Sequence, residues 1–133
     1  MTTVKMWYRP DHPYTGLTAG TAEKLSTVLD GFITDDHYLD IMQMVITDAE
    51  GVDHLMDLAA ASSDGVGALR YSSHGQQWFT KGEPSGLEAV EFTYFGTPHE
   101  FPTDSLIPLA KVRQAAAEFQ AADGQRPTCV AWQ

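Results

Sequence analysis

Basic residues are scarce in this chain, and their scarcity is its most informative absence. The 133 residues include 8 Lys and Arg against 18 Asp and Glu, which gives a formal net charge of −10 at pH 7. Such an acidic surface repels phosphate groups, which argues against direct binding to nucleic acid or to an anionic membrane. The chain also lacks a run of about 18 apolar residues that could span a membrane, and its first residues lack the apolar segment of a signal peptide. We therefore expect a cytosolic protein.

Cysteine and metal-ligand patterns are nearly absent as well. Cys129 is the single cysteine, so no disulfide forms within the chain, in agreement with a reducing compartment. The acidic segment 48–53 has its glycine in the wrong place for a calcium loop, and it is better explained as a hairpin turn. None of the histidines has the spacing or close pairing of zinc ligands, so the sequence predicts no metal and no cofactor; they are His12, His37, His54, His74 and His99.

The periodicity of the apolar residues predicts one domain, 1–133, of the α+β class. Thr21 is placed to cap a helix whose apolar residues recur from Leu25 to Ile33 at helical spacing, and a second helix is predicted to begin near Pro108 and to end at Gly124. Short connections favour a mainly antiparallel sheet with both helices packed on one face, in the order β-α-β-β-β-β-β-α-β. The predicted strands are 2–8, 41–46, 54–60, 67–73, 76–81, 88–95 and 128–132.

Acidic residues concentrate in the segment 25–69, which contains no Lys or Arg. Its acids nearly equal the whole net charge. One interpretation is a solvated acidic face without a partner, and the other is a surface that meets a basic partner. The nine acids are Asp30, Asp35, Asp36, Asp40, Asp48, Glu50, Asp53, Asp57 and Asp64.

No catalytic motif stands out along the chain. Cys129 lies in a predicted terminal strand, where a buried, inert thiol is expected, and the serine pairs 62–63 and 72–73 lack a nucleophile-elbow motif. Two of the 18 acids could still face each other across a cleft. A small hydrolase or ligand-binding domain that uses paired carboxylates therefore remains an alternative, as does a structural interaction module.

Several segments of the C-terminal half resemble a known family. They are GALRY (67–71), WFTKGE (78–83), EFPTDSLIPL (100–109), KVRQA (111–115) and GQRPTCVAWQ (124–133). These segments are similar to the first-numbered Imm family of bacterial immunity proteins from polymorphic toxin systems, which are often encoded beside nucleic-acid deaminase toxins. The resemblance covers about 65–133. It implies a non-enzymatic protein that binds a cognate toxin domain one-to-one and occludes its active site, with any zinc supplied by the toxin.

The resemblance also suggests where the toxin binds. A region that must fit one particular toxin should differ among relatives, so we look for it in the half that matches the family less closely. We expect Trp78 and Trp132, which match the family pattern, to pack in the scaffold, and Glu100 to order the loop before the second helix. The predicted toxin-binding residues are Asp35, Asp36, Asp40, Asp48, Glu50 and Asp53.

Overall fold

A computed structural model describes residues 2–9, 16–34 and 41–133 of the chain. Asp35, Asp36 and Asp40 lie outside the described residues. The helices are α1 (Ala22–Thr34) and α2 (Leu109–Ala121), with a 3-10 turn at Ser62–Asp64. The strands are β1 (Val4–Trp7), β2 (Leu17–Ala19), β3 (Ile41–Thr47), β4 (Asp53–Ala61), β5 (Val66–Ser73), β6 (Gln76–Phe79), β7 (Val90–Tyr94), β8 (Thr97–Phe101) and β9 (Ile107–Pro108).

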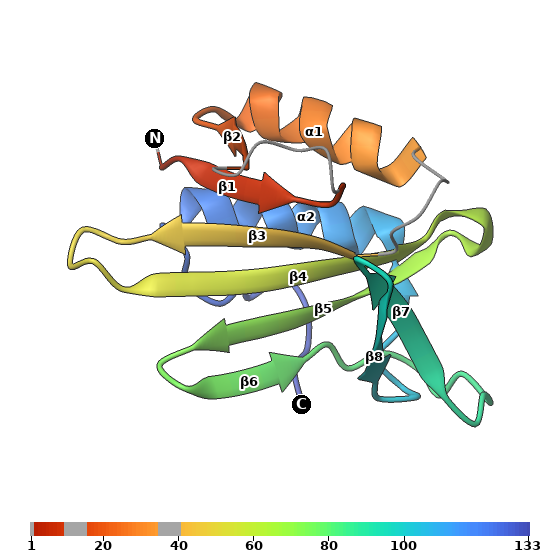
Figure 1. Ribbon diagram of the computed structural model, residues 1–133. Helices are drawn as coiled ribbons and strands as arrows, with labels where there is room; N and C mark the ends of the chain where they lie inside the picture. The colour runs from red at the N-terminus through yellow and green to blue at the C-terminus, as the bar shows by residue number, and fades with distance from the viewer. Residues whose placement is uncertain (1, 10–15, 35–40) are drawn as a thin grey trace.

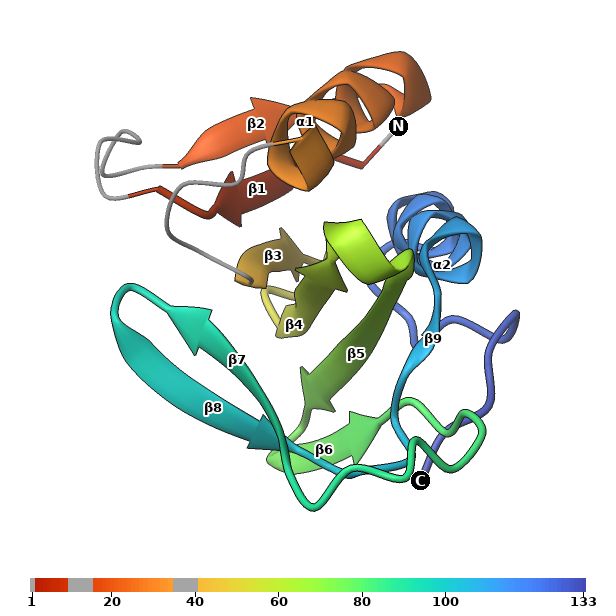
Figure 2. The same ribbon diagram turned by 90° about the vertical axis from the view of Figure 1, so that its right-hand side faces the viewer.

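The main sheet is antiparallel and is covered by both helices on the same face (Figure 1). Its strands follow the order β2-β1-β3-β4-β5-β6, and β9 pairs with the start of β5. Strands β7 and β8 form a separate hairpin that extends from the opposite face, as the turned view shows (Figure 2). The predicted α+β class, with a mainly antiparallel sheet and two helices, is confirmed.

Helix α1 forms where its cap and its apolar stripe predict it. The Thr21 hydroxyl oxygen accepts a hydrogen bond of 3.1 Å from the Lys24 N–H, which satisfies one of the free donors of the first turn. The buried side chains of the helix recur every three or four residues, so one face packs on the sheet. They are Leu25, Val28, Leu29 and Phe32.

Helix α2 follows Pro108 directly and ends just before a glycine. Gly124 adopts a φ of 88° and donates a hydrogen bond of 2.9 Å to the Phe119 carbonyl oxygen, which closes the last turn. The buried stripe of this helix completes the larger of two cores, in which strand residues Met6, Met44 and Met56 are fully buried. Its helical members are Val112, Ala115, Ala116 and Phe119.

The structure differs from the sequence prediction in its short elements. Strands β2, β8 and β9 fall outside the predicted strands, because each is short and carries little apolar alternation, and β9 ends at Pro108, where the second helix was predicted to begin. The segment 128–132 makes a single β-bridge, between Trp132 and Thr80, rather than a strand. In the described part of the chain, neither helix is long and apolar enough to cross a membrane.

Candidate functional site

The candidate site is the sheet face that the helices leave uncovered, which we call the open face. Successive strand residues point to opposite faces of the sheet. Met44 and Met56 are paired across β3 and β4 and point to the helices. The next pair along these strands, Val45 and Leu55, therefore points to the open face. The β7–β8 hairpin stands on one end of this face (Figures 1 and 2). The remainder of the face is therefore bordered on one side by a wall.

The hairpin is fixed to the sheet by a small second core. Val90, Phe92 and Phe101 pack against sheet residues that include Ile41 and Ala59. The Phe101 ring lies 5.3 Å from that of Phe92, nearly perpendicular to it, in the edge-to-face geometry that aromatic pairs favour. The base of the hairpin is thus a rigid part of the fold.

A buried polar cluster adds to this attachment. The Arg70 guanidinium donates through Nε to Asp57 Oδ2 at 2.8 Å, and Gln43 Nε2 donates to the other carboxylate oxygen at 3.3 Å. Arg70 also reaches Nδ1 of His99 on β8 at 3.3 Å, and because arginine can only donate, this nitrogen is the acceptor. The Asp57 and Arg70 side chains are 7% and 16% exposed. The cluster therefore links β3, β4 and β5 to the hairpin.

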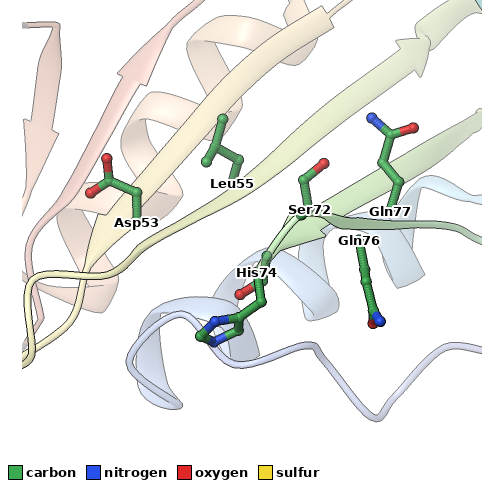
Figure 3. Close-up of a pocket in the computed structure, with 8 residues that line it drawn as sticks. Asp53, Leu55, Ser72, His74, Gln76 and Gln77 are labelled. Carbon is green, nitrogen blue, oxygen red and sulfur yellow. The ribbon is translucent and has the colours of Figure 1, made fainter.

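Two of the pockets on the open face lie near Asp53. The first, of about 470 Å³, is lined by residues of β1, β3 and β4 and by Tyr94 of the hairpin. Burial, and next the negative charge of Asp57, raise the pKa of Tyr94 to about 12, so its phenol stays protonated. The second, of about 410 Å³, lies toward the β5–β6 turn, where Asp53, Leu55 and Ser72 point to the same side (Figure 3).

Each of these pockets contains one carboxylate, that of Asp53. The paired carboxylates that a hydrolase of the alternative kind needs are not brought together in either of them. Two acids of the acid-rich segment instead form ion pairs elsewhere in the fold. Asp57 is bound by Arg70, and Asp30 lies 2.8 Å from Arg113 of α2.

The predicted site residues that the structure describes gather at the β3–β4 turn. Glu50 and Asp53 are exposed, and Asp53 accepts a hydrogen bond of 2.6 Å from the Thr47 hydroxyl. Asp48 instead points inward and accepts backbone N–H groups of Glu50 and Val52 at 2.9 and 3.0 Å. Glu50 and Asp53 therefore present their carboxylates to solvent, while Asp48 holds the turn that carries them.

Asp48 also begins a chain of side chains that resembles a catalytic triad. Its Oδ2 lies 2.9 Å from His54 Nε2, and His54 Nδ1 lies 2.8 Å from the Ser73 hydroxyl. His54 is 2% exposed and Ser73 is 8% exposed, and Gly124 packs directly against the imidazole. These largely buried bonds connect the β3–β4 turn to β5, so the chain of side chains has a structural role in holding the turn. The hydrogen bond from His54, and next that from Val52, lower the pKa of Asp48.

The thiol of Cys129 and possible metal-binding groups were also considered as parts of a site. Burial, and next the negative charge of Glu118, raise the pKa of the Cys129 thiol, which disfavours the reactive thiolate. Within residues 2–9, 16–34 and 41–133, no group of three or more His, Cys, Asp or Glu side chains is placed to hold a metal ion.

The β7–β8 hairpin is a candidate functional element that the sequence pattern does not reveal. Tyr94 borders the first pocket, and Phe95 at the hairpin tip is 41% exposed, one of two large hydrophobic side chains that stand out among the described residues. Glu100 was expected to order a loop, but it lies exposed in β8 opposite Glu91. Trp78 and Trp132 pack against the main core, as predicted. The signal that could have revealed the hairpin is the Phe95-Gly96 pair at the end of the alternating segment 88–95.

Comparison with known families gives one match. The model of the family described as immunity protein Imm1 matches residues 14–133, which is most of the chain and extends well beyond the segments that carried the resemblance. No curated protein matches.

Proposed function

Because the chain belongs to the Imm1 family of immunity proteins, we propose that it neutralises its toxin by covering the toxin's active site in a one-to-one complex. The family match is the observation that carries this proposal. Immunity against a toxin requires a protein-binding surface and no turnover, and the open face with its hairpin wall carries two pockets lined by polar and aromatic side chains, which interfaces commonly use. A second possibility, catalysis by paired carboxylates, has less support, because neither of the two pockets described above brings two carboxylates together.

The toxin that this surface fits best is an enzyme acting on nucleic acid, and a deaminase in particular. Such an enzyme binds its substrate in a basic groove, and a net charge of −10 complements that groove. Opposite potentials raise association rates far above those of neutral partners. The complex forms in the cytosol, where a toxin of this kind reaches its substrate. Because a deaminase brings its own zinc, the immunity protein needs no cofactor.

Within the proposed interface, the acids around the β3–β4 turn guide the toxin onto the open face. Glu50 and Asp53 are free to approach basic side chains, and Asp48 acts through the turn that it holds. Asp35, Asp36 and Asp40 complete the set of proposed toxin-binding acids. The buried centre of the interface would come from the aromatic and polar groups of the open face, since rim charges contribute more to rate than to affinity.

Co-expression with the toxin domain encoded in the adjacent reading frame tests the proposal. Cells that make both proteins are expected to grow, and mixing the purified proteins should give a one-to-one complex by light scattering. A catalytically inactive toxin serves as the binding partner where the active one is lethal. Growth arrest despite co-expression, together with no complex, would contradict the proposed function.

A further inference from the structure

The tip of the β7–β8 hairpin combines exposure with an unusual backbone conformation. Phe95 has a φ of 49° and Gly96 a φ of 80°, so both central residues of this two-residue turn lie in the left-handed region. Glycine, asparagine and aspartate are the residues favoured there, and a bulky aromatic residue is uncommon. The Phe95 ring also remains 41% exposed, with its centroid 4.3 Å from that of Tyr94. Neither local stability nor burial explains a phenylalanine at this position.

The outer face of the hairpin carries two neighbouring carboxylates without a basic partner among the described residues. Glu91 and Glu100 are direct cross-strand partners and both are exposed. Like charges opposite each other weaken strand pairing. Neither carboxylate forms an ion pair within the part of the chain that the structure describes. A cationic group from outside the fold would relieve this repulsion.

The ligand that these features imitate is a nucleotide held in an enzyme pocket. Enzymes that modify a base enclose it between aromatic and apolar side chains, and basic side chains bind the phosphates around it. We infer that the β7–β8 hairpin inserts into the toxin's nucleobase pocket, with the Phe95 ring in place of the base and with Glu91 and Glu100, four residues from the tip on each strand, facing the basic side chains at the mouth of that pocket. This inference rests on the proposed function and adds the element and the chemistry by which the active site is covered.

The attachment of the hairpin suits insertion. Its base is held by the second core and by the Arg70–His99 contact, while its tip projects away from the sheet on the open side (Figure 2). A rigid aromatic residue on a fixed support loses little conformational freedom on binding, so its apolar contact is not offset by ordering. The first pocket lies beside Tyr94, next to the hairpin tip. It can receive toxin side chains from the rim of the nucleobase pocket.

Phe95→Asn separates binding from folding. Asparagine is favoured in this turn conformation, so the variant should have the wild-type melting temperature or a higher one. Its Kd for the catalytically inactive toxin domain should nevertheless rise about tenfold or more, as for a residue at the centre of an interface. Leu87→Asn is the matched control, because Leu87 is 54% exposed and precedes β7 at the end of the hairpin remote from the tip. Its Kd should change less than about threefold. Equal Kd values for Phe95→Asn and the wild type would overturn the inference.

A competition experiment tests whether the immunity protein occupies the toxin's nucleobase pocket. A short single-stranded oligonucleotide that the inactive toxin binds should compete with the wild-type immunity protein, and the complex should not bind the oligonucleotide. A ternary complex of toxin, immunity protein and oligonucleotide would overturn the inference even if Phe95→Asn weakens binding. If the wild type itself binds no toxin, the proposed function fails and the inference falls with it; if the wild type binds and Phe95→Asn binds equally, the inference alone fails.

Discussion

At the scale of single residues, the surroundings of a carboxylate decide what it does. Asp48 and Asp53 are five positions apart in the same acidic segment, yet Asp53 points to solvent and Asp48 is held by His54 and by two backbone N–H groups. The partner of His54 is Ser73, from a different strand. The hydrogen bonds of Asp48 therefore attach the β3–β4 turn to the core, although a charged residue in this segment would be expected at the surface.

Asp48→Asn should reduce stability in a pH-dependent manner. The folded state lowers the pKa of Asp48, so the stabilisation is fully present above the unfolded-state pKa of about 4 and is lost as the pH falls through the folded-state pKa. The melting temperature of the variant should be a few degrees below that of the wild type at pH 7, and the two should converge in acid. Thermal scans from pH 7 to pH 2 measure this difference. Glu50→Gln, at an exposed site in the same turn, is the control; equal behaviour of the two variants would contradict the assigned role.

At the scale of elements, the two-stranded hairpin depends on the sheet below it. Its inner face is apolar at the base, and the Asp57–Arg70 pair and His99 complete the contact. Removing one partner of a buried ion pair leaves the other charge without compensation, which costs more than the pair itself contributes. The attachment of the β7–β8 hairpin to the sheet therefore depends on Arg70.

Arg70→Ala should be strongly destabilising, by about 3–5 kcal/mol, because it leaves the Asp57 carboxylate buried and unpaired. Arg113→Ala is the matched control, since the Arg113–Asp30 pair is solvent-exposed and such pairs contribute at most about 1 kcal/mol. The double variant Asp57→Leu/Arg70→Met should recover much of the loss, because apolar side chains can replace a buried pair. Urea unfolding compares the free energies. A loss for Arg70→Ala no larger than for Arg113→Ala would contradict this description of the cluster.

The elements also show what the sequence could and could not predict. The helices follow from apolar spacing and from local signals such as Thr21, and the long strands follow from alternation. Strand β8 begins Thr97-Pro98 and is mostly polar, so only its pairing with β7 makes it a strand. The candidate site could not be predicted in the same way, because it is formed by contacts between segments that are distant in the sequence. No local pattern shows that Arg70 binds Asp57 or that Arg113 binds Asp30, so the number of free acids could not be read from the sequence.

At the scale of the whole molecule, exposed negative charge lies at two places beside the open face. Glu50 and Asp53 lie at the β3–β4 turn and Glu91 and Glu100 lie on the hairpin. The net charge of −10 sets the long-range attraction to a basic partner. In the proposed complex, short-range fit comes from the hairpin and the open face. Rate and affinity therefore depend on different residues.

The association rate with the inactive toxin should fall steeply as salt rises, because screening shortens the reach of the charges from about 30 Å at 0.01 M to about 8 Å at 0.15 M ionic strength. The variant Glu50→Gln/Asp53→Asn should associate more slowly at low salt and dissociate at nearly the wild-type rate. Stopped-flow mixing measures both rates. A rate that is independent of salt would remove the acidic residues from the binding mechanism.

Titration of toxin activity with the purified immunity protein tests the central claim most directly. If the chain covers the active site in a one-to-one complex, activity on a nucleic-acid substrate should decline linearly and vanish at one equivalent, and more substrate should slow the onset of inhibition. Residual activity at saturation, or inhibition whose onset is indifferent to substrate, would contradict the account.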